Sequence, residues 1–72
     1  MQTLRELANE ILKSNNGLYK DFRVKIDFDN VINTYWFTGL PHHLLDVRPK
    51  FITWRADIRN KEVKITIRDW RV

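Results

Sequence analysis

The stretch FRVKIDFDNVINTYWFT, residues 22–38, alternates apolar and polar side chains on both sides of Asp29-Asn30. A period of two is typical of half-buried β-strands, and Asp and Asn tolerate the positive φ angles of a two-residue hairpin turn. A tight turn here predicts one register: Phe28 with Val31, Ile26 with Asn33, Val24 with Tyr35, Asp27 with Ile32, Lys25 with Thr34 and Arg23 with Trp36. One face of the hairpin is then apolar except for Asn33. A one-residue slip would mix the two faces.

The same alternation returns in FITWRADIRNKEVKITIRDW, residues 51–70, around Asn60-Lys61. A turn at that dipeptide predicts a second hairpin with this register: Ile58 with Val63, Ala56 with Ile65, Trp54 with Ile67, Asp57 with Lys64, Arg55 with Thr66, Thr53 with Arg68 and Phe51 with Trp70. Opposite charges or aromatic rings that face each other across an antiparallel ladder contribute about 0.2–1 kcal/mol per pair. The charged and aromatic pairs therefore favour this register.

Residues 3–15 carry the pattern of an amphipathic helix. Thr3 followed by Glu6 fits a capping box, in which each residue satisfies a free backbone N–H of the first turn. One apolar stripe follows at helical spacing: Leu4, Leu7, Ala8, Ile11 and Leu12. Gly17 then supplies a residue that easily adopts the left-handed conformation with which helices end.

The segment GLPHHLLDVRPK, residues 39–50, interrupts the alternation between the two hairpins. Pro41 suits the start of one short helical turn. That turn would bring together the only candidate metal ligands at helical spacing, His42, His43 and Asp46. The chain has no cysteine and no other histidine, so these residues are too few for a metal site and predict an exposed polar loop.

Together these segments predict a single small α+β domain over residues 1–72. An N-terminal amphipathic helix packs on one face of a four-stranded antiparallel sheet made of two β-hairpins, because the helix offers the only matching apolar stripe. The order of the strands stays open at this stage. In any order, one face of the sheet is left uncovered.

The composition argues against catalysis. A chain of 72 residues with one serine, two glycines and no cysteine lacks a nucleophile motif, a phosphate-binding glycine loop and a dinucleotide fingerprint. The acidic residues alternate with Lys and Arg, as in a solvated charged ladder. The sequence predicts a protein that is not an enzyme and needs no cofactor.

The hydropathy pattern bears on location. No apolar run approaches the roughly 20 residues that span a bilayer, and the first ten residues are acidic where a signal peptide would be basic and then apolar. We expect a soluble cytoplasmic protein with no membrane partner.

Charge is distributed unevenly along the chain. The net charge is +4, with a net −1 over residues 1–46 and a net +5 over residues 47–72. In the predicted registers the uncovered sheet face gathers cations and aromatic rings, and these are the candidate binding residues: Arg23, Lys25, Trp36, Phe51, Arg55, Lys64, Arg68 and Trp70. A positive surface of this kind favours polyanionic or acidic partners.

Two classes of function fit that face. The favoured one is a nucleic-acid-binding module, since exposed rings stack unpaired bases and cations neutralise phosphates. The alternative is a small regulator or inhibitor that binds an acidic protein surface, or forms a homodimer, through the same face or through an edge strand. A purely structural use of these residues, including a cation–π contact between Arg23 and Trp36, is the third possibility.

Overall fold

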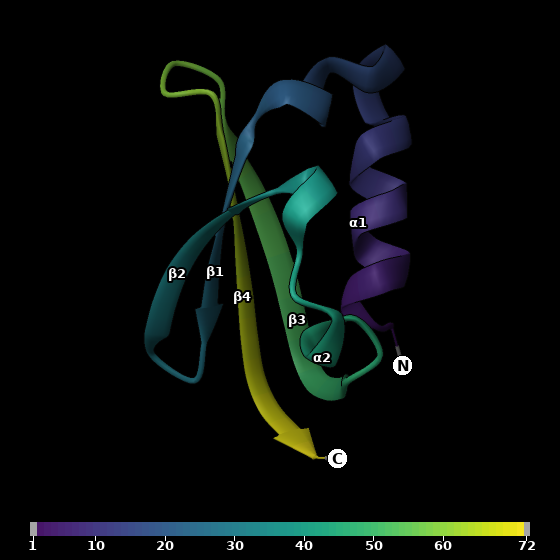
Figure 1. Ribbon diagram of the computed structural model, residues 1–72, viewed down its shortest axis with the longest axis vertical. Coiled ribbons are helices and arrows are strands. Elements are labelled where there is room, and N and C mark those ends of the chain that lie inside the picture. The colour runs from purple at the N-terminus through teal and green to yellow at the C-terminus, as the bar shows by residue number, and fades with distance from the viewer. Residues whose placement is uncertain (1, 72) are drawn as a thin grey trace.

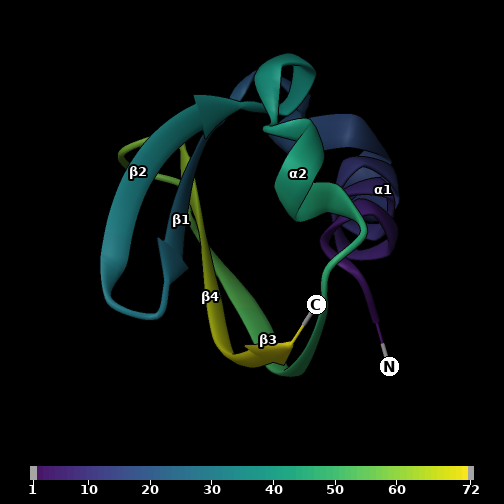
Figure 2. The same cartoon turned by 60° about the horizontal axis from the view of Figure 1, so that its bottom comes forward.

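The computed structural model describes the backbone of residues 2–71 and the side chains of residues 2–68. Its elements are α1 (Leu4–Lys13), the 3-10 segment η1 (Ser14–Asp21), β1 (Arg23–Phe28), β2 (Val31–Trp36), the 3-10 turn η2 (Phe37–Gly39), α2 (His42–Leu45), β3 (Arg48–Asp57) and β4 (Glu62–Arg71). The fold is α+β, as the sequence predicts. Four strands form one curved sheet, and α1 and α2 both lie on its concave side (Figures 1 and 2).

The prediction of a purely antiparallel sheet is wrong. The strand order is β2-β1-β4-β3, so each hairpin is antiparallel within itself but β1 and β4 pair in parallel. Lys25 on β1 lies opposite Lys64 on β4, and Ile26 lies opposite Ile65. The sheet is therefore mixed.

The burial of the strands explains this order. Five inward residues of the two central strands are 0–1% exposed: Val24, Ile26, Val63, Ile65 and Ile67. The inward side of β2 is interrupted by the exposed amide Asn33, which fits an edge position better than a central one. Placing β1 beside β4 thus puts the two most apolar inner surfaces together under α1.

The first hairpin has the predicted register, with Phe28 opposite Val31 and Arg23 opposite Trp36. Its turn residues, Asp29 and Asn30, both have positive φ angles, 50° and 73°. The first hairpin is therefore confirmed in full over β1 and β2.

The second hairpin is shifted by two residues from the predicted register. Residues 58–61 form a longer turn, in which the Lys61 N–H donates to the Ile58 carbonyl at 3.2 Å. The Asp57 carboxylate also accepts from the backbone N–H and the side-chain amide of Asn60, at 3.2 and 2.7 Å. These bonds favour the longer turn and leave Ile58 exposed rather than paired with Val63.

The shift changes the neighbours but not the faces. Because side chains alternate with a period of two, a shift of two residues leaves each side chain on its predicted face. Arg55, predicted opposite Thr66, instead lies opposite Lys64, and Phe51, predicted opposite Trp70, lies opposite Arg68. Asp57 lies opposite Glu62, so the predicted neutralising pair of Asp57 with Lys64 does not form.

Helix α1 begins as its sequence predicts. Thr3 is the N-cap, the Glu6 N–H donates to its hydroxyl at 3.2 Å, and the Thr3 N–H donates to the Glu6 carboxylate at 2.9 Å. The helix ends at Lys13, two residues earlier than predicted. The next residue, Ser14, has an extended backbone and begins η1. Within η1 three consecutive residues are left-handed: Asn15, Asn16 and Gly17.

The core lies between α1 and the concave side of the sheet. Four of the five predicted stripe residues are buried there, with Leu4, Leu7, Ala8 and Ile11 at most 5% exposed, whereas Leu12 is half-buried. The helical turn predicted after Pro41 is α2, and its residues Leu44 and Leu45 pack against the edge of this core. Within residues 2–71, no helix has the length and apolar character needed to cross a membrane.

Candidate functional site

The convex side of the sheet, which we call the open face, carries the polar half of β1, β3 and β4 and the side chains of Ile32, Thr34 and Trp36 from β2. Its described members follow from the registers: Ile32, Thr34 and Trp36 on β2; Arg23, Lys25 and Asp27 on β1; Glu62, Lys64, Thr66 and Arg68 on β4; Phe51, Thr53, Arg55 and Asp57 on β3. Every predicted binding residue with a described side chain lies on this face. Trp70 lies outside the residues whose side chains the structure describes.

Three cations lie in one line across three neighbouring strands. Lys64 on the central strand β4 is flanked by Lys25 on β1 and by Arg55 on β3, each as its direct register partner. We call this line the cation row. Directly opposed residues have Cβ atoms about 5 Å apart, and like charges at that separation destabilise a sheet.

Part of this repulsion is relieved at one end of the cation row. The Lys25 ammonium lies 3.7 Å from the Glu62 carboxylate, which is a long and partly exposed ion pair. The Asp57 carboxylate is instead bound to Asn60 in the turn. Among the described side chains, Arg55 and Lys64 have no hydrogen-bond or ion-pair partner, so their charges are available to a ligand.

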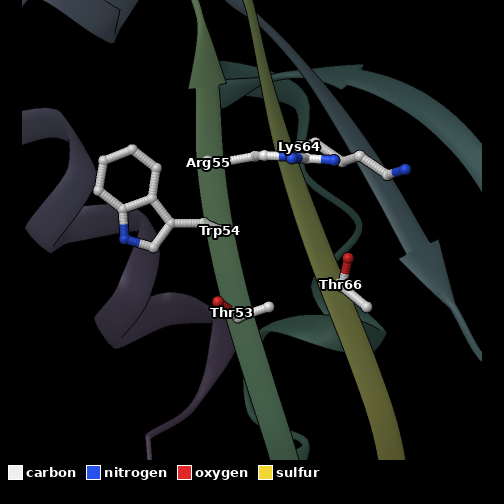
Figure 3. A pocket seen from close by; sticks show the side chains of 5 residues that line it. All are labelled: Thr53, Trp54, Arg55, Lys64 and Thr66. Atoms are coloured by element: carbon white, nitrogen blue, oxygen red, sulfur yellow. The ribbon is translucent and has the colours of Figure 1, made fainter.

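A shallow depression of about 320 Å³ lies on the β3 and β4 side of the cation row. Figure 3 shows Arg55 extending from β3 across β4 toward Lys64, with Thr53 and Thr66 close by on the same two strands. The indole of Trp54 points the other way, toward the helix side, where it contacts Tyr19 edge-on with 5.7 Å between ring centroids. Two cations and two hydroxyls thus surround a space open to solvent, which is the donor set that binds phosphate oxygens.

Arg68 is occupied within the fold. Its two terminal nitrogens donate to the two carboxylate oxygens of Asp27, each at 3.0 Å, and further to the Asp27 and Ile67 carbonyls. Its Nη2 also reaches the Asn30 side chain at 3.2 Å. This guanidinium connects β4 to the β1–β2 turn. Because its donors are used within the fold, Arg68 is not one of the proposed contact residues.

The Asp27–Arg68 pair makes stability depend on pH. The hydrogen bonds from Arg68, and after them the one from the Asn30 N–H, hold the pKa of Asp27 below its usual value. A carboxyl group with a lower pKa in the folded state stabilises the fold above its unfolded pKa of about 4, and this contribution is lost as pH falls through the folded pKa.

We therefore expect Asp27→Asn to melt several degrees below the wild-type protein near neutral pH. The difference should narrow as the pH falls below the unfolded pKa of about 4, because the unfolded chain then binds a proton at Asp27 more readily than the folded protein does. Thermal unfolding followed by circular dichroism checks both points. A difference that stays constant from about pH 7 to pH 2 would show that the ionised pair contributes nothing.

The two aromatic residues of the open face whose side chains the structure describes lie at opposite corners. Trp36 is 56% exposed on β2. Its direct partner on β1 is Arg23, which is two residues from Lys25 along that strand. Phe51 is 50% exposed on β3, four residues from Arg55, which is roughly 13 Å along a strand. Trp36 is thus the ring nearer to the cation row, and the two rings do not form one stacking platform.

Arg23 is partly committed to the fold. Its Nη2 donates to the Asn60 carbonyl at 3.3 Å, and its backbone N–H donates to the Lys61 carbonyl. These bonds tie β1 to the 58–61 turn. The side chain lies beside Trp36 but has less freedom to reach a ligand than Lys64 or Arg55.

The carboxylate of the predicted loop cluster is bound within the fold. Asp46 forms a two-bond ion pair with Arg5 of α1, with N–O distances of 3.0 and 3.3 Å. That hydrogen bonding lowers the pKa of Asp46 and connects the end of α2 to α1. In the described part of the chain, no group of three His, Cys, Asp or Glu residues could hold a metal ion.

The sequence did not reveal the cation row or the depression beside it. Both depend on the parallel pairing of β1 with β4, which no short segment of sequence contains. They also depend on the two-residue shift of the second hairpin, which follows from the Asp57–Asn60 hydrogen bonds and leaves the apolar pattern unchanged. Thr53 and Thr66, which line the depression, were missed for the same reason.

No protein-family model, curated protein or solved structure matches this chain.

Proposed function

We propose that this protein is a non-enzymatic nucleic-acid-binding module that holds a single strand across its open face. In this proposal, the cation row of Lys25, Lys64 and Arg55 contacts backbone phosphates, and Trp36 stacks on an unpaired base. A cytoplasmic location is part of the proposal.

The observation that supports it most is the like-charge pairing of the cation row. A sheet gains stability when opposite charges face each other, yet here Lys64 faces a cation on each side. Local features that oppose stability tend to occur at functional sites. A bound polyanion would remove the repulsion, since each phosphate supplies a negative charge between the cations.

The position of Trp36 supports a single strand over a duplex. Trp36 is exposed and diagonal to Lys25, and the Cα atoms of such diagonal neighbours lie about 7–8 Å apart. Stacking on an exposed ring contributes about 1–3 kcal/mol per base and requires a base that is free of pairing. A duplex offers phosphates to the cation row but no free base face to Trp36.

Salt dependence provides the test. Three phosphate contacts predict a slope of about −2 for log affinity against log salt, or roughly a 20-fold loss between 50 and 200 mM. Anisotropy of a labelled mixed-sequence oligonucleotide measures it, with a duplex for comparison. Lys64→Gln should make the slope shallower by about 0.7.

A matched control separates the cation row from overall charge. Lys13→Gln removes the same charge from the exposed side of α1 and should leave the slope unchanged. Equal effects of the two substitutions would mean that net charge alone attracts the nucleic acid. No binding even at low salt would refute the proposal.

The alternative function is a regulator that binds an acidic protein surface. Exposed apolar side chains on β2, namely Val31, Ile32 and Trp36, favour contact with a protein. In that case Trp36→Ala should abolish capture of the partner while the melting temperature stays nearly unchanged. The oligonucleotide would then show no salt-dependent binding.

A further inference from the structure

The two edges of the sheet differ in how they are protected. An unprotected edge strand can pair with another chain, and proteins prevent this with charged residues, Pro or bulges. The edge strand β3 has several such features: Arg48, Pro49, Lys50, Arg55 and Asp57. The other edge strand, β2, has the sequence VINTYW, with no charge, no Pro and an uninterrupted register against β1.

Among the described side chains, β2 carries three of the six large apolar residues that are exposed. Val31 is 61% exposed, Ile32 52% and Trp36 56%, all within one six-residue strand, whereas the other three lie on separate elements: Leu18, Phe51 and Ile58. Within residues 2–71, β2 is paired with β1 alone. The strand therefore offers both a free backbone edge and uncovered apolar side chains.

We propose that β2 pairs with β2 of a second copy of this chain, antiparallel and around a two-fold axis. The two four-stranded sheets then form one continuous sheet. The proposal goes beyond the nucleic-acid function and does not depend on it, since the backbone pairing uses the edge of the sheet and neither the cation row nor the depression. Trp36 is the one residue that both proposals use.

A second copy fits this edge for two reasons. Each chain carries a net charge of +4, but β2 has no charged residue, so the pairing brings no like charges directly together. The side chains are also self-complementary. When Thr34 lies opposite Thr34 of the second copy, Ile32 lies opposite Trp36 of the second copy, and Thr–Thr and aromatic–β-branched pairs stabilise antiparallel strands.

This register has a consequence for the open face. Even-numbered residues of β2 face even-numbered residues of the second copy, so both open faces lie on the same side of the joined sheet. Thr34 is also the direct partner of Lys25 in the first hairpin. The two cation rows would therefore lie in one line, joined through the paired threonines.

The length of the strand sets the expected strength. Six residues span about 20 Å, and pairing one edge of that length buries less than the roughly 1,200 Å² of a standard stable interface. We therefore expect a reversible dimer whose fraction rises with protein concentration between about 10 μM and 1 mM.

Sedimentation velocity over that concentration range, without nucleic acid, tests the proposal. The wild-type protein should shift from monomer toward twice the monomer mass. Thr34→Lys should remain monomeric, because it places a positive charge opposite itself across the two-fold axis. Trp36→Thr should weaken the dimer at least tenfold without adding a charge.

Thr53→Lys is the matched control. Thr53 is likewise an exposed threonine of the open face on an edge strand, but on β3, so its substitution should leave dimerisation unchanged. Circular dichroism confirms that each variant is folded. A wild-type protein that stays monomeric at about 1 mM, a dimer that survives Thr34→Lys, or equal losses in both lysine variants would overturn the proposal. The oligonucleotide test is run below about 10 μM protein, where the protein is monomeric, so its outcome is read separately from these results.

Discussion

The Ile65→Ala variant is expected to lose about 2–5 kcal/mol of its free energy of unfolding, the usual range for Ile→Ala in a core. Ile65 is 0% exposed on the central strand β4, between Ile26 on β1 and Trp54 on β3. A domain of this size has roughly 4–11 kcal/mol in total. The midpoint of thermal unfolding should therefore fall by roughly 10–30 °C.

Urea unfolding measures this loss, with two control variants. Ile65→Val removes one methylene group and should lose about 0.5–1.5 kcal/mol. Ile32→Ala makes the same chemical change as Ile65→Ala at a site that is 52% exposed, and it should stay within about 0.5 kcal/mol of the wild-type protein. If the two Ile→Ala variants lost equal stability, Ile65 would not lie in the core.

The parts of the fold that sequence predicted are those set by local chemistry. The Thr3–Glu6 capping box begins α1, and the Asp29-Asn30 turn determines the register of the first hairpin. In both cases the residues that decide the geometry lie within a few positions of one another. Their hydrogen bonds and backbone preferences therefore act before any distant part of the chain is in place.

The second hairpin shows where local reasoning fails. Asn60-Lys61 resembles a two-residue turn, but Asp57 accepts two hydrogen bonds from Asn60 and thereby favours the longer turn. The apolar pattern could not reveal this error. An apolar pattern with a period of two shows which face of the strand a side chain lies on. It cannot distinguish two pairing registers that differ by two residues, because both put every side chain on the same face.

The parallel pairing of β1 with β4 follows from competition among strands for the centre of the sheet. Val24 and Val63 are both 0% exposed, whereas β2 carries Asn33 on its inner side. The best arrangement buries the most apolar pair together. That choice compares residues about 40 positions apart, and no short window of sequence contains it.

The same limits apply to the candidate site. The predicted faces were sufficient to place Lys25, Arg55 and Lys64 on one surface. They could not show that the three cations adjoin in one line, or that Arg68 is bound to Asp27. Adjacency on a sheet depends on register and strand order, which were the two features that sequence left open or predicted wrongly.

The triple variant Lys25→Gln/Arg55→Gln/Lys64→Gln should bind a single-stranded oligonucleotide at least about 100-fold more weakly at low salt, with a salt slope near zero. All three proposed phosphate contacts are removed at once. Its melting temperature should equal or exceed that of the wild-type protein, because the repulsion within the cation row is gone. The only ion pair lost among the described side chains is the long one between Lys25 and Glu62.

A second triple variant, Lys13→Gln/Lys20→Gln/Lys50→Gln, separates position from net charge. These lysines are exposed and lie off the open face, and their removal lowers the net charge by the same amount. It should keep nearly the full salt slope and most of the affinity. If both triple variants lose binding equally, the cation row is not the site. If the cation-row variant instead melts well below the wild-type protein, the three charges stabilise the fold. The repulsion that supports the proposed function would then not exist.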